Sequence, residues 1–318
     1  METMMELDLV VTDIRLETPQ VKTFEIRRTD GGRLPAFTPG SHIRIQTPSG
    51  LVRKYSLTNS AEETHRYLIA VKREEQGRGG SKSLWEDLRM GAPVRISEPS
   101  NAFALVEKAK SLIFIAGGIG ITPILSMIRS MGELPVAPWT LYYLSPSLEQ
   151  TAFLQELTSG QYPGKVVVHH TDGKPNNRFD LWPVLEKENT GHVYCCGSNS
   201  LMEAVRDMTG HWSHAHIHFE SFDDAVVARP DDVPFQVKCA KAHIDIEVPV
   251  GKSILEVLLE QGVAVPFSCE SGTCGTCKTD LLAGAADHRD FVLLPEERSH
   301  KIMLCVSRAK SASIELAL

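Results

Sequence analysis

Four of the seven cysteines are spaced as ligands of an iron–sulfur cluster. They follow the pattern C-x4-C-x2-C, with a fourth cysteine after a further 27 residues. The four are Cys269, Cys274, Cys277 and Cys305. A [2Fe–2S] cluster needs two thiolates on each iron, and this is the plant-type spacing, typical of one-electron chemistry near about −400 mV. Gly272 and Gly275 allow the loop to turn its N–H groups toward the sulfurs.

A structural zinc site is the alternative use of these cysteines. Zinc sites favour two C-x2-C units around one tetrahedral ion. Here the first gap is four residues long, and a second C-x2-C unit is missing. The spacing therefore favours the iron–sulfur cluster.

A second segment that could take part in chemistry is Arg53-Lys54-Tyr55-Ser56-Leu57-Thr58. It resembles the R-x-Y-S-[LT] flavin motif of the ferredoxin–NADP reductase superfamily. An arginine can neutralise a flavin phosphate, a tyrosine edge can pack on the isoalloxazine ring, and serine or backbone groups can bond its N5–O4 edge. The motif is weak when taken alone, because a barrel strand without a ligand can carry the same residues.

A glycine-rich loop, residues 77–83, follows a strand that ends at Val71-Lys72-Arg73. Its sequence is Gly77-Arg78-Gly79-Gly80-Ser81-Lys82-Ser83. Consecutive backbone N–H groups at a helix start bind an anion, and Arg78 and Lys82 add positive charge. The loop serves one phosphate and no adenylate site is evident, so FMN is favoured over FAD. A solvated surface loop is the plain alternative.

A second glycine-rich segment, residues 117–123, resembles the G-G-x-G-x-[TS]-P nucleotide-binding turn of the same superfamily. It reads Gly117-Gly118-Ile119-Gly120-Ile121-Thr122-Pro123 after an apolar strand. Glycines here let the backbone approach a pyrophosphate at the start of the next helix. Asp172 argues against the 2′-phosphate of NADPH, whereas Lys174 and Arg178 argue for it, and we favour NADH.

The elements that must position these segments fall into three blocks. Residues 1–106 hold short strands between turn signals, which predicts an antiparallel β-barrel. Residues 107–224 alternate strands and helices, which predicts a doubly wound parallel α/β domain. Residues 225–233 form a linker by composition, and residues 234–318 form a domain around the cysteine loop. The fold class is therefore multidomain α/β and β.

Charge and hydrophobicity limit the kinds of partner and the cellular compartment that we expect. The formal net charge is −7, and no long basic run is present, which argues against nucleic acid. No apolar stretch reaches the length of a membrane span. The first residues lack the apolar core of a signal peptide, so we expect a cytoplasmic location.

The order flavin barrel, nucleotide domain and ferredoxin resembles the phthalate dioxygenase reductase family of the ferredoxin–NADP reductase superfamily, over the whole chain. Several stretches carry the resemblance: residues 71–73, 77–81, 116–123, 193–197, 207–212, 218–222 and 286–290. Vanillate demethylase reductases are similar.

The resemblance implies a C-terminal β-grasp ferredoxin domain and roles for particular residues. Cys196 and Gly197 would lie beside the nicotinamide, and Phe222 would stack on the flavin. The residues expected to take part directly in the reaction are Ser56, Cys196 and Phe222. Those expected to bind FMN are Arg53, Tyr55, Ser56, Leu57, Val71, Lys72, Arg78, Gly79, Gly80, Ser81 and Phe222. Those expected to bind NADH are Gly117, Gly118, Gly120, Ile121, Thr122, Pro123, Cys196 and Gly197.

The function that the resemblance implies is an NADH-dependent reductase in aromatic-compound catabolism. Electrons would pass from NADH through FMN to the [2Fe–2S] cluster and on to a terminal oxygenase with a Rieske centre and non-haem iron. We expect a monomer. The alternatives are the reductase of a vanillate-type O-demethylase, a stand-alone quinone reductase, and a redox sensor that does not use the coenzyme.

Overall fold

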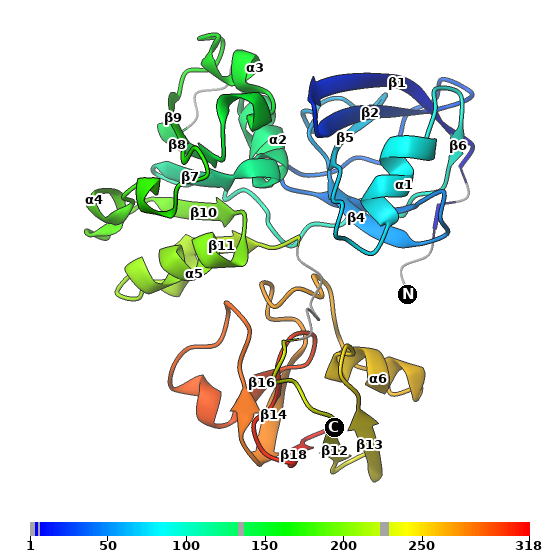
Figure 1. Cartoon of the computed structure of the whole chain (residues 1–318), viewed down its shortest axis with the longest axis vertical. Helices are drawn as coiled ribbons and strands as arrows, with labels where there is room; N and C mark the ends of the chain where they lie inside the picture. Colours follow the sequence, from blue (N-terminus) through cyan, green and yellow to red (C-terminus); the bar gives the residue numbers. More distant parts are fainter. Residues whose placement is uncertain (1–3, 6, 133–136, 223–228) are drawn as a thin grey trace. The chain divides into compact units, whose positions relative to one another are not determined.

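The computed structural model of the chain describes residues 4–5, 7–132, 137–222 and 229–318 (Figure 1). The chain divides into two compact units, Met1–Phe219 and Glu220–Leu318. Part of the expected linker, residues 225–228, lies outside the described residues. No described helix combines the length and apolar character that crossing a bilayer requires.

The first half of unit one is a small β-barrel (Figure 1). Its four-stranded antiparallel sheet has the order β5-β2-β1-β6. These strands are β1 (Leu9–Thr18), β2 (Val21–Arg28), β5 (Tyr67–Lys72) and β6 (Pro93–Val94). A hairpin, β3 (His42–Gln46) and β4 (Val52–Ser56), meets this sheet through the bridges Ile45–Ile96 and Leu57–Ile69. Those four side chains are completely buried, so sheet and hairpin enclose one core. Helix α1 (Gly80–Asp87) follows β5.

The second half of unit one is a five-stranded sheet of order β11-β10-β7-β8-β9 (Figure 1). Its strands are β7 (Leu112–Gly117), β8 (Trp139–Ser145), β9 (Lys165–His170), β10 (His192–Cys196) and β11 (Ile217–Glu220). The helices between them are α2 (Ile121–Met131), α3 (Leu154–Thr158), α4 (Trp182–Leu185) and α5 (Asn199–Met208). The chain runs from β7 outward to β9 and then returns to β10 on the other side of β7. The strand order therefore reverses between β7 and β10, which is where doubly wound folds bind ligands.

Unit two is a five-stranded mixed sheet of order β13-β12-β18-β14-β16. Its strands are β12 (Phe235–Cys239), β13 (Ile244–Val248), β14 (Lys278–Ala283), β16 (Lys301–Met303) and β18 (Ser313–Leu316). Helix α6 (Ile254–Glu260) begins with a capping box, in which Ser253 and Glu256 satisfy each other's backbone N–H groups. A short pair, β15 (Ala286–Asp287) and β17 (Arg308–Ala309), completes the unit.

The structure corrects the sequence at several elements. The sequence predicts strands over residues 55–59 and 302–306. In the structure the first strand lies earlier, at β4, and the second, β16, ends at Met303. Strands β14, β15 and β17 were not predicted. Alternating exposure along β14 buries only Leu281, so the strand lacks a strong apolar pattern. The predicted fold class itself is confirmed.

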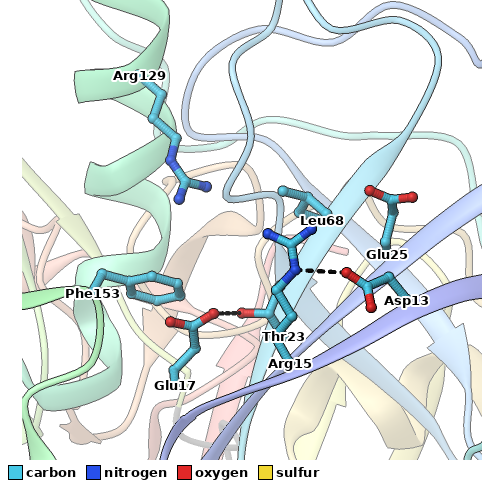
Figure 2. Close-up of a pocket in the computed structure, with 8 residues that line it drawn as sticks. All are labelled: Asp13, Arg15, Glu17, Thr23, Glu25, Leu68, Arg129 and Phe153. Atoms are coloured by element: carbon cyan, nitrogen blue, oxygen red, sulfur yellow. Dashed lines mark hydrogen bonds and ion pairs between the residues drawn. The ribbon is translucent and has the colours of Figure 1, made fainter. Parts of the chain in front are cut away.

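Charged side chains lie where the barrel meets helix α2 in unit one. Figure 2 shows a small pocket there, lined by residues of β1, β2, β5 and α2 and by Phe153, which precedes α3. Its charges are paired: Arg15 Nε is 2.6 Å from Asp13 Oδ2, and Arg129 Nε is 2.7 Å from Glu156 Oε1. None of the predicted cofactor-binding residues lines this pocket. We assign it a structural role.

Glu25 in the same pocket is buried and strongly hydrogen-bonded. Its carboxylate accepts bonds from Arg27 Nε at 2.6 Å, Thr12 Oγ1 at 2.7 Å and Arg66 Nη1 at 2.9 Å. Burial alone would raise the pKa of Glu25, but these three bonds outweigh it and lower the pKa to about 2. The ionised carboxylate therefore stabilises the fold.

Replacing Glu25 by glutamine is expected to lower the free energy of unfolding of unit one by about 2–3 kcal/mol at neutral pH. The contribution is complete above the ordinary pKa of 4.5 and is lost as pH falls toward 2. The difference between wild type and variant should therefore shrink across that window.

Urea unfolding followed by tryptophan fluorescence measures this directly, because all four tryptophans lie in unit one. They are Trp85, Trp139, Trp182 and Trp212. The exposed Glu149, replaced by glutamine, is the control and should change little. Equal stability of wild type and the Glu25 variant at pH 7 would contradict the prediction.

Candidate functional site

The four predicted cluster ligands come together in unit two. Cys269, Cys277 and Cys305 are buried, and Cys274 is half-buried. Short contacts link them. Cys277 Sγ lies 3.3 Å from Cys305 Sγ, and Cys269 N lies 3.5 Å from Cys274 Sγ. None is in a disulfide. Four thiols gathered in this way suit two irons that each take two thiolates.

The loop that carries these cysteines aims backbone donors at sulfur. The N–H groups of Ser271 and Thr273 both lie 3.4 Å from Cys269 Sγ. Left-handed backbone at Glu270, Gly272 and Gly275 produces this curl, with φ values of 56°, 74° and 83°. Both N–H groups can donate to a thiolate sulfur. The donor set therefore fits a thiolate-bound cluster.

A mononuclear site fits this arrangement less well. Among the described residues, no group of three His, Cys, Asp or Glu side chains is arranged to hold a single metal ion. A binuclear cluster asks for only two thiolates at each iron.

The two predicted flavin segments meet in the barrel. A Cβ placed on Gly80 would lie 2.9 Å from Arg53 Cγ and 3.1 Å from Arg53 Nε, so Arg53 lies against the start of α1. Gly79 caps that helix with φ 89° and no side-chain hydrogen bond. A guanidinium beside open helix N–H groups can hold one phosphate. Tyr55, two residues after Arg53 on β4, shares its strand face.

Other predicted flavin residues have different surroundings. Val71 is completely buried in the barrel core. Lys72 Nζ is 2.6 Å from Glu74 Oε1, so its charge is already paired. Ser81 Oγ accepts a bond from Glu74 N at 3.2 Å and ties the loop down. These three support the loop through packing and hydrogen bonds; direct contact with a flavin stays a prediction for them, as it does for the buried Ser56 and Leu57 and for Arg78.

The predicted coenzyme residues meet where the strand order reverses. Ala116 pairs with Cys196 across β7 and β10, so the turns after both strands are neighbours. A Cβ on Gly120 would lie 2.1 Å from the Cys196 carbonyl oxygen, and one on Gly117 would lie 3.2 Å from Gly197 Cα. The glycines therefore allow two backbones to touch. Doubly wound folds bind dinucleotides at such a reversal of strand order, so the contact between the two turns marks the place expected for the coenzyme.

The other coenzyme residues shape this turn. Thr122 Oγ1 donates to the Ile119 carbonyl oxygen at 3.0 Å, and Ile121, Thr122 and Pro123 are buried at the start of α2. Gly118 has φ 53°, which favours glycine. Ser198 caps α5 by accepting a bond from Leu201 N. Both strand ends therefore lead into helix N-termini that can face an anion.

Replacing Gly120 by alanine is expected to force the two turns apart, because the new Cβ would overlap the Cys196 carbonyl group. Overpacking of this kind costs about 1–3 kcal/mol of stability, and we expect the KM for NADH to rise. Urea unfolding by tryptophan fluorescence and flavin bleaching at graded NADH concentrations measure the two effects. Gly210→Ala is the control, since the nearest atom to its Cβ would be 3.6 Å away. An unchanged KM in the Gly120 variant would contradict the placement of NADH at these two turns.

Two of the residues expected to act in the reaction differ in exposure. Cys196 is completely buried at the end of β10, beside Gly120. Phe222 is 38% exposed and follows β11 by two residues. Stacking of Phe222 on the flavin stays a prediction.

The structure adds supporting residues that the sequence did not suggest. Leu201 Cδ2 would lie 2.9 Å from a Cβ on either Gly117 or Gly197, so this side chain covers both turns. In unit two, Val306 would contact a Cβ on Gly272 at 2.7 Å. Both are ordinary apolar residues, and only their place in the fold distinguishes them.

Comparisons with known proteins agree with these sites. Residues 114–207 match the oxidoreductase NAD-binding domain family, and residues 237–310 match the 2Fe-2S iron-sulfur cluster binding domain family. The phthalate 4,5-dioxygenase oxygenase reductase subunit of Pseudomonas putida is 47% identical over 93% of this chain and 91% of that protein. The tetrachlorobenzoquinone reductase of Sphingobium chlorophenolicum is 37% identical over 98% and 97%.

A solved structure agrees over the whole length. It is described as phthalate dioxygenase reductase, a modular structure for electron transfer from pyridine nucleotides to [2Fe-2S]. The two chains are 46% identical, each is covered to 98%, and the TM-score is 0.74. At this identity and coverage, this chain belongs to the phthalate dioxygenase reductase family.

Proposed function

We propose that this chain is the NADH-dependent reductase component of a two-component oxygenase of the phthalate dioxygenase type. The observation that carries the proposal is the gathering of the four cysteines in a chain whose other unit brings the glycine turns after β7 and β10 into contact. A hydride donor supplies two electrons at once, whereas a [2Fe–2S] cluster passes them singly. FMN and the cluster, when bound, would together make that conversion.

The chain's own groups hold and orient these partners. Arg53 and the N–H groups of Gly80 and Ser81 would bind the FMN phosphate, and Tyr55 would pack on the ring. The backbone of Gly117–Gly120 would bind the pyrophosphate of NADH, and Cys196 would border the nicotinamide. The N–H groups of Ser271 and Thr273 would stabilise negative charge on the cluster sulfurs. Hydride transfer needs no acid–base pair from the protein.

Electrons would leave through the exposed side of the cysteine loop. Cys274 is the half-buried ligand, and Thr276 beside it is exposed. The rim residues Glu270, Ser271 and Thr273 are half-buried. This surface is the proposed docking site for an oxygenase with a Rieske centre and non-haem iron. A monomeric state and a cytoplasmic location belong to the same proposal.

The quinone reductase among the relatives favours a second candidate function. The two are separated by comparing turnover with NADH and either a purified Rieske oxygenase or a substituted benzoquinone. The proposal predicts coupled oxygenase turnover at least as fast as quinone reduction. Fast quinone reduction without any coupling to an oxygenase would favour the alternative. A vanillate-type demethylase oxygenase tested beside a phthalate dioxygenase would identify the partner class.

A further inference from the structure

Residues 288–293 follow β15 and contact the cysteine loop, and the proposed function does not use them. Asp290 in this segment has 0% exposure. Its Oδ1 accepts hydrogen bonds from Val292 N at 3.1 Å and Leu293 N at 2.7 Å. A carboxylate that bonds the N–H groups two and three residues ahead closes a tight turn. Asp290 therefore holds the turn formed by residues 290–293.

This turn supports the cysteine loop at both of its glycines. Phe291 N donates to the Gly272 carbonyl oxygen at 2.9 Å. A Cβ on Gly272 would lie 3.3 Å from Asp290 Cα, and one on Gly275 would lie 3.3 Å from Val292 Cγ1. Both glycines have positive φ, so the curl of the loop depends on close contact with this turn.

Arg289, the residue before the turn, is held by two ion pairs. Arg289 Nε lies 2.6 Å from Asp287 Oδ2, and the Arg289 guanidinium also pairs with Asp232 in the segment before β12. The Arg289 side chain is 11% exposed, and burial strengthens such pairs. Since Arg289 is bonded to these two carboxylates, it does not pair with its neighbour Asp290 among the contacts described.

The second oxygen of Asp290 is buried without a hydrogen-bond partner among the described residues. His288 Nδ1 lies 3.9 Å from this oxygen and is likewise buried without a hydrogen-bond partner among the described residues. His288 Nε2 lies 2.9 Å from the Arg298 carbonyl oxygen and must donate to it. In the neutral imidazole, Nδ1 is then an acceptor and offers no proton to Asp290.

We propose that Asp290 is a positioning residue for the cysteine loop and that its buried charge lowers the reduction potential of the cluster. This inference rests on the proposed cluster. Reduction adds one electron to a centre that the loop encloses, and a fixed negative charge behind the loop opposes that addition. The bonds of Oδ1 carry the positioning role, and the net charge of the carboxylate carries the electrostatic role.

Asparagine and alanine at position 290 separate these two roles. Asp290→Asn keeps an acceptor oxygen for Val292 and Leu293 but removes the charge, whereas Asp290→Ala removes both. Asp280→Asn is the matched control, because it deletes one carboxylate that is exposed on β14 and paired with Lys301. The measurements on the holoprotein are the iron content, the EPR line shape of the reduced cluster, and its midpoint potential by redox titration.

We expect the Asn variant to bind a full complement of iron with a wild-type EPR line shape. Its ratio of reduced to oxidised cluster at a fixed potential should rise by about tenfold, which is about 59 mV for a one-electron couple. The Ala variant should lose iron or change the line shape, and the Asp280 variant should match wild type. If Asp290→Ala does not fold while Asp290→Asn is fully loaded, the positioning role is also supported.

An unshifted potential in Asp290→Asn would overturn the electrostatic role. A fully loaded Ala variant with the wild-type line shape would overturn the positioning role. Wild-type protein without iron–sulfur absorbance would instead contradict the proposed function, so the two failures can be told apart.

Discussion

Cys277→Ser is expected to reduce NADH-driven electron transfer to a one-electron protein acceptor to background, while NADH still bleaches the flavin. Cys277 is 2% exposed, and its sulfur lies 3.3 Å from that of Cys305, so no other thiol can replace it without rebuilding the loop. Arg53 and the glycine turns after β7 and β10 lie in the other unit, so flavin reduction by NADH should be unaffected. Cytochrome c reduction measures the first activity, and anaerobic bleaching near 450 nm measures the second.

Cys239→Ser is the matched control for this variant. Cys239 is a buried cysteine of the same unit, on β12, and it lies outside the ligand pattern. Its replacement should leave both activities close to wild type. If Cys277→Ser also loses flavin bleaching by NADH, the order of carriers in the proposal is wrong. If it keeps cytochrome c reduction, the cluster is not the exit.

Arg53→Ala should weaken FMN binding by about 10- to 100-fold, because a charge-assisted hydrogen bond contributes about 1.5–3 kcal/mol. Arg53 lies against Gly80 at the start of α1, where a phosphate would meet both the guanidinium and the helix N–H groups. Titration of the flavin-free protein with FMN, followed by quenching of flavin fluorescence, measures the dissociation constant. Arg53→Lys should recover part of the affinity, since it restores charge but not a bidentate contact.

The neighbouring Lys54→Ala supplies the control. Lys54 lies on the opposite face of β4 by strand alternation, so its loss should change FMN affinity little. A Lys54 variant that weakens FMN as much as the Arg53 variant would place the phosphate elsewhere. Riboflavin, which lacks the phosphate, should bind wild type and Arg53→Ala equally.

The sequence predicts the candidate binding sites wherever they depend on residues spaced closely along the chain. Three of the four cysteines and the two glycines of the cysteine loop lie within one short segment, so their spacing is evident from the sequence. The glycine turn at residues 117–120 is local in the same way. The alternating blocks indicated both the barrel and the parallel sheet, and the match to a whole-length relative structure confirms the fold class.

What the sequence could not supply are contacts between distant segments. The sequence does not show that Gly80 contacts Arg53, or that Gly120 contacts the Cys196 carbonyl group. Strand β14 was missed because its exposed, polar-rich residues depend on β16 and β18 for pairing. Asp290 has the same character: its type is ordinary, and only burial behind the cysteine loop gives it a role.

The central claim is that electrons from NADH reach the flavin first and the iron–sulfur cluster second. An anaerobic titration of the holoprotein with NADH tests it most directly, with flavin absorbance and the EPR signal of the reduced cluster recorded on the same samples. We predict that both centres become reduced in the wild type and that the Cys277→Ser protein shows flavin reduction alone. A flavin that stays oxidised with excess NADH, or a cluster that is reduced when FMN has been removed, would contradict the account.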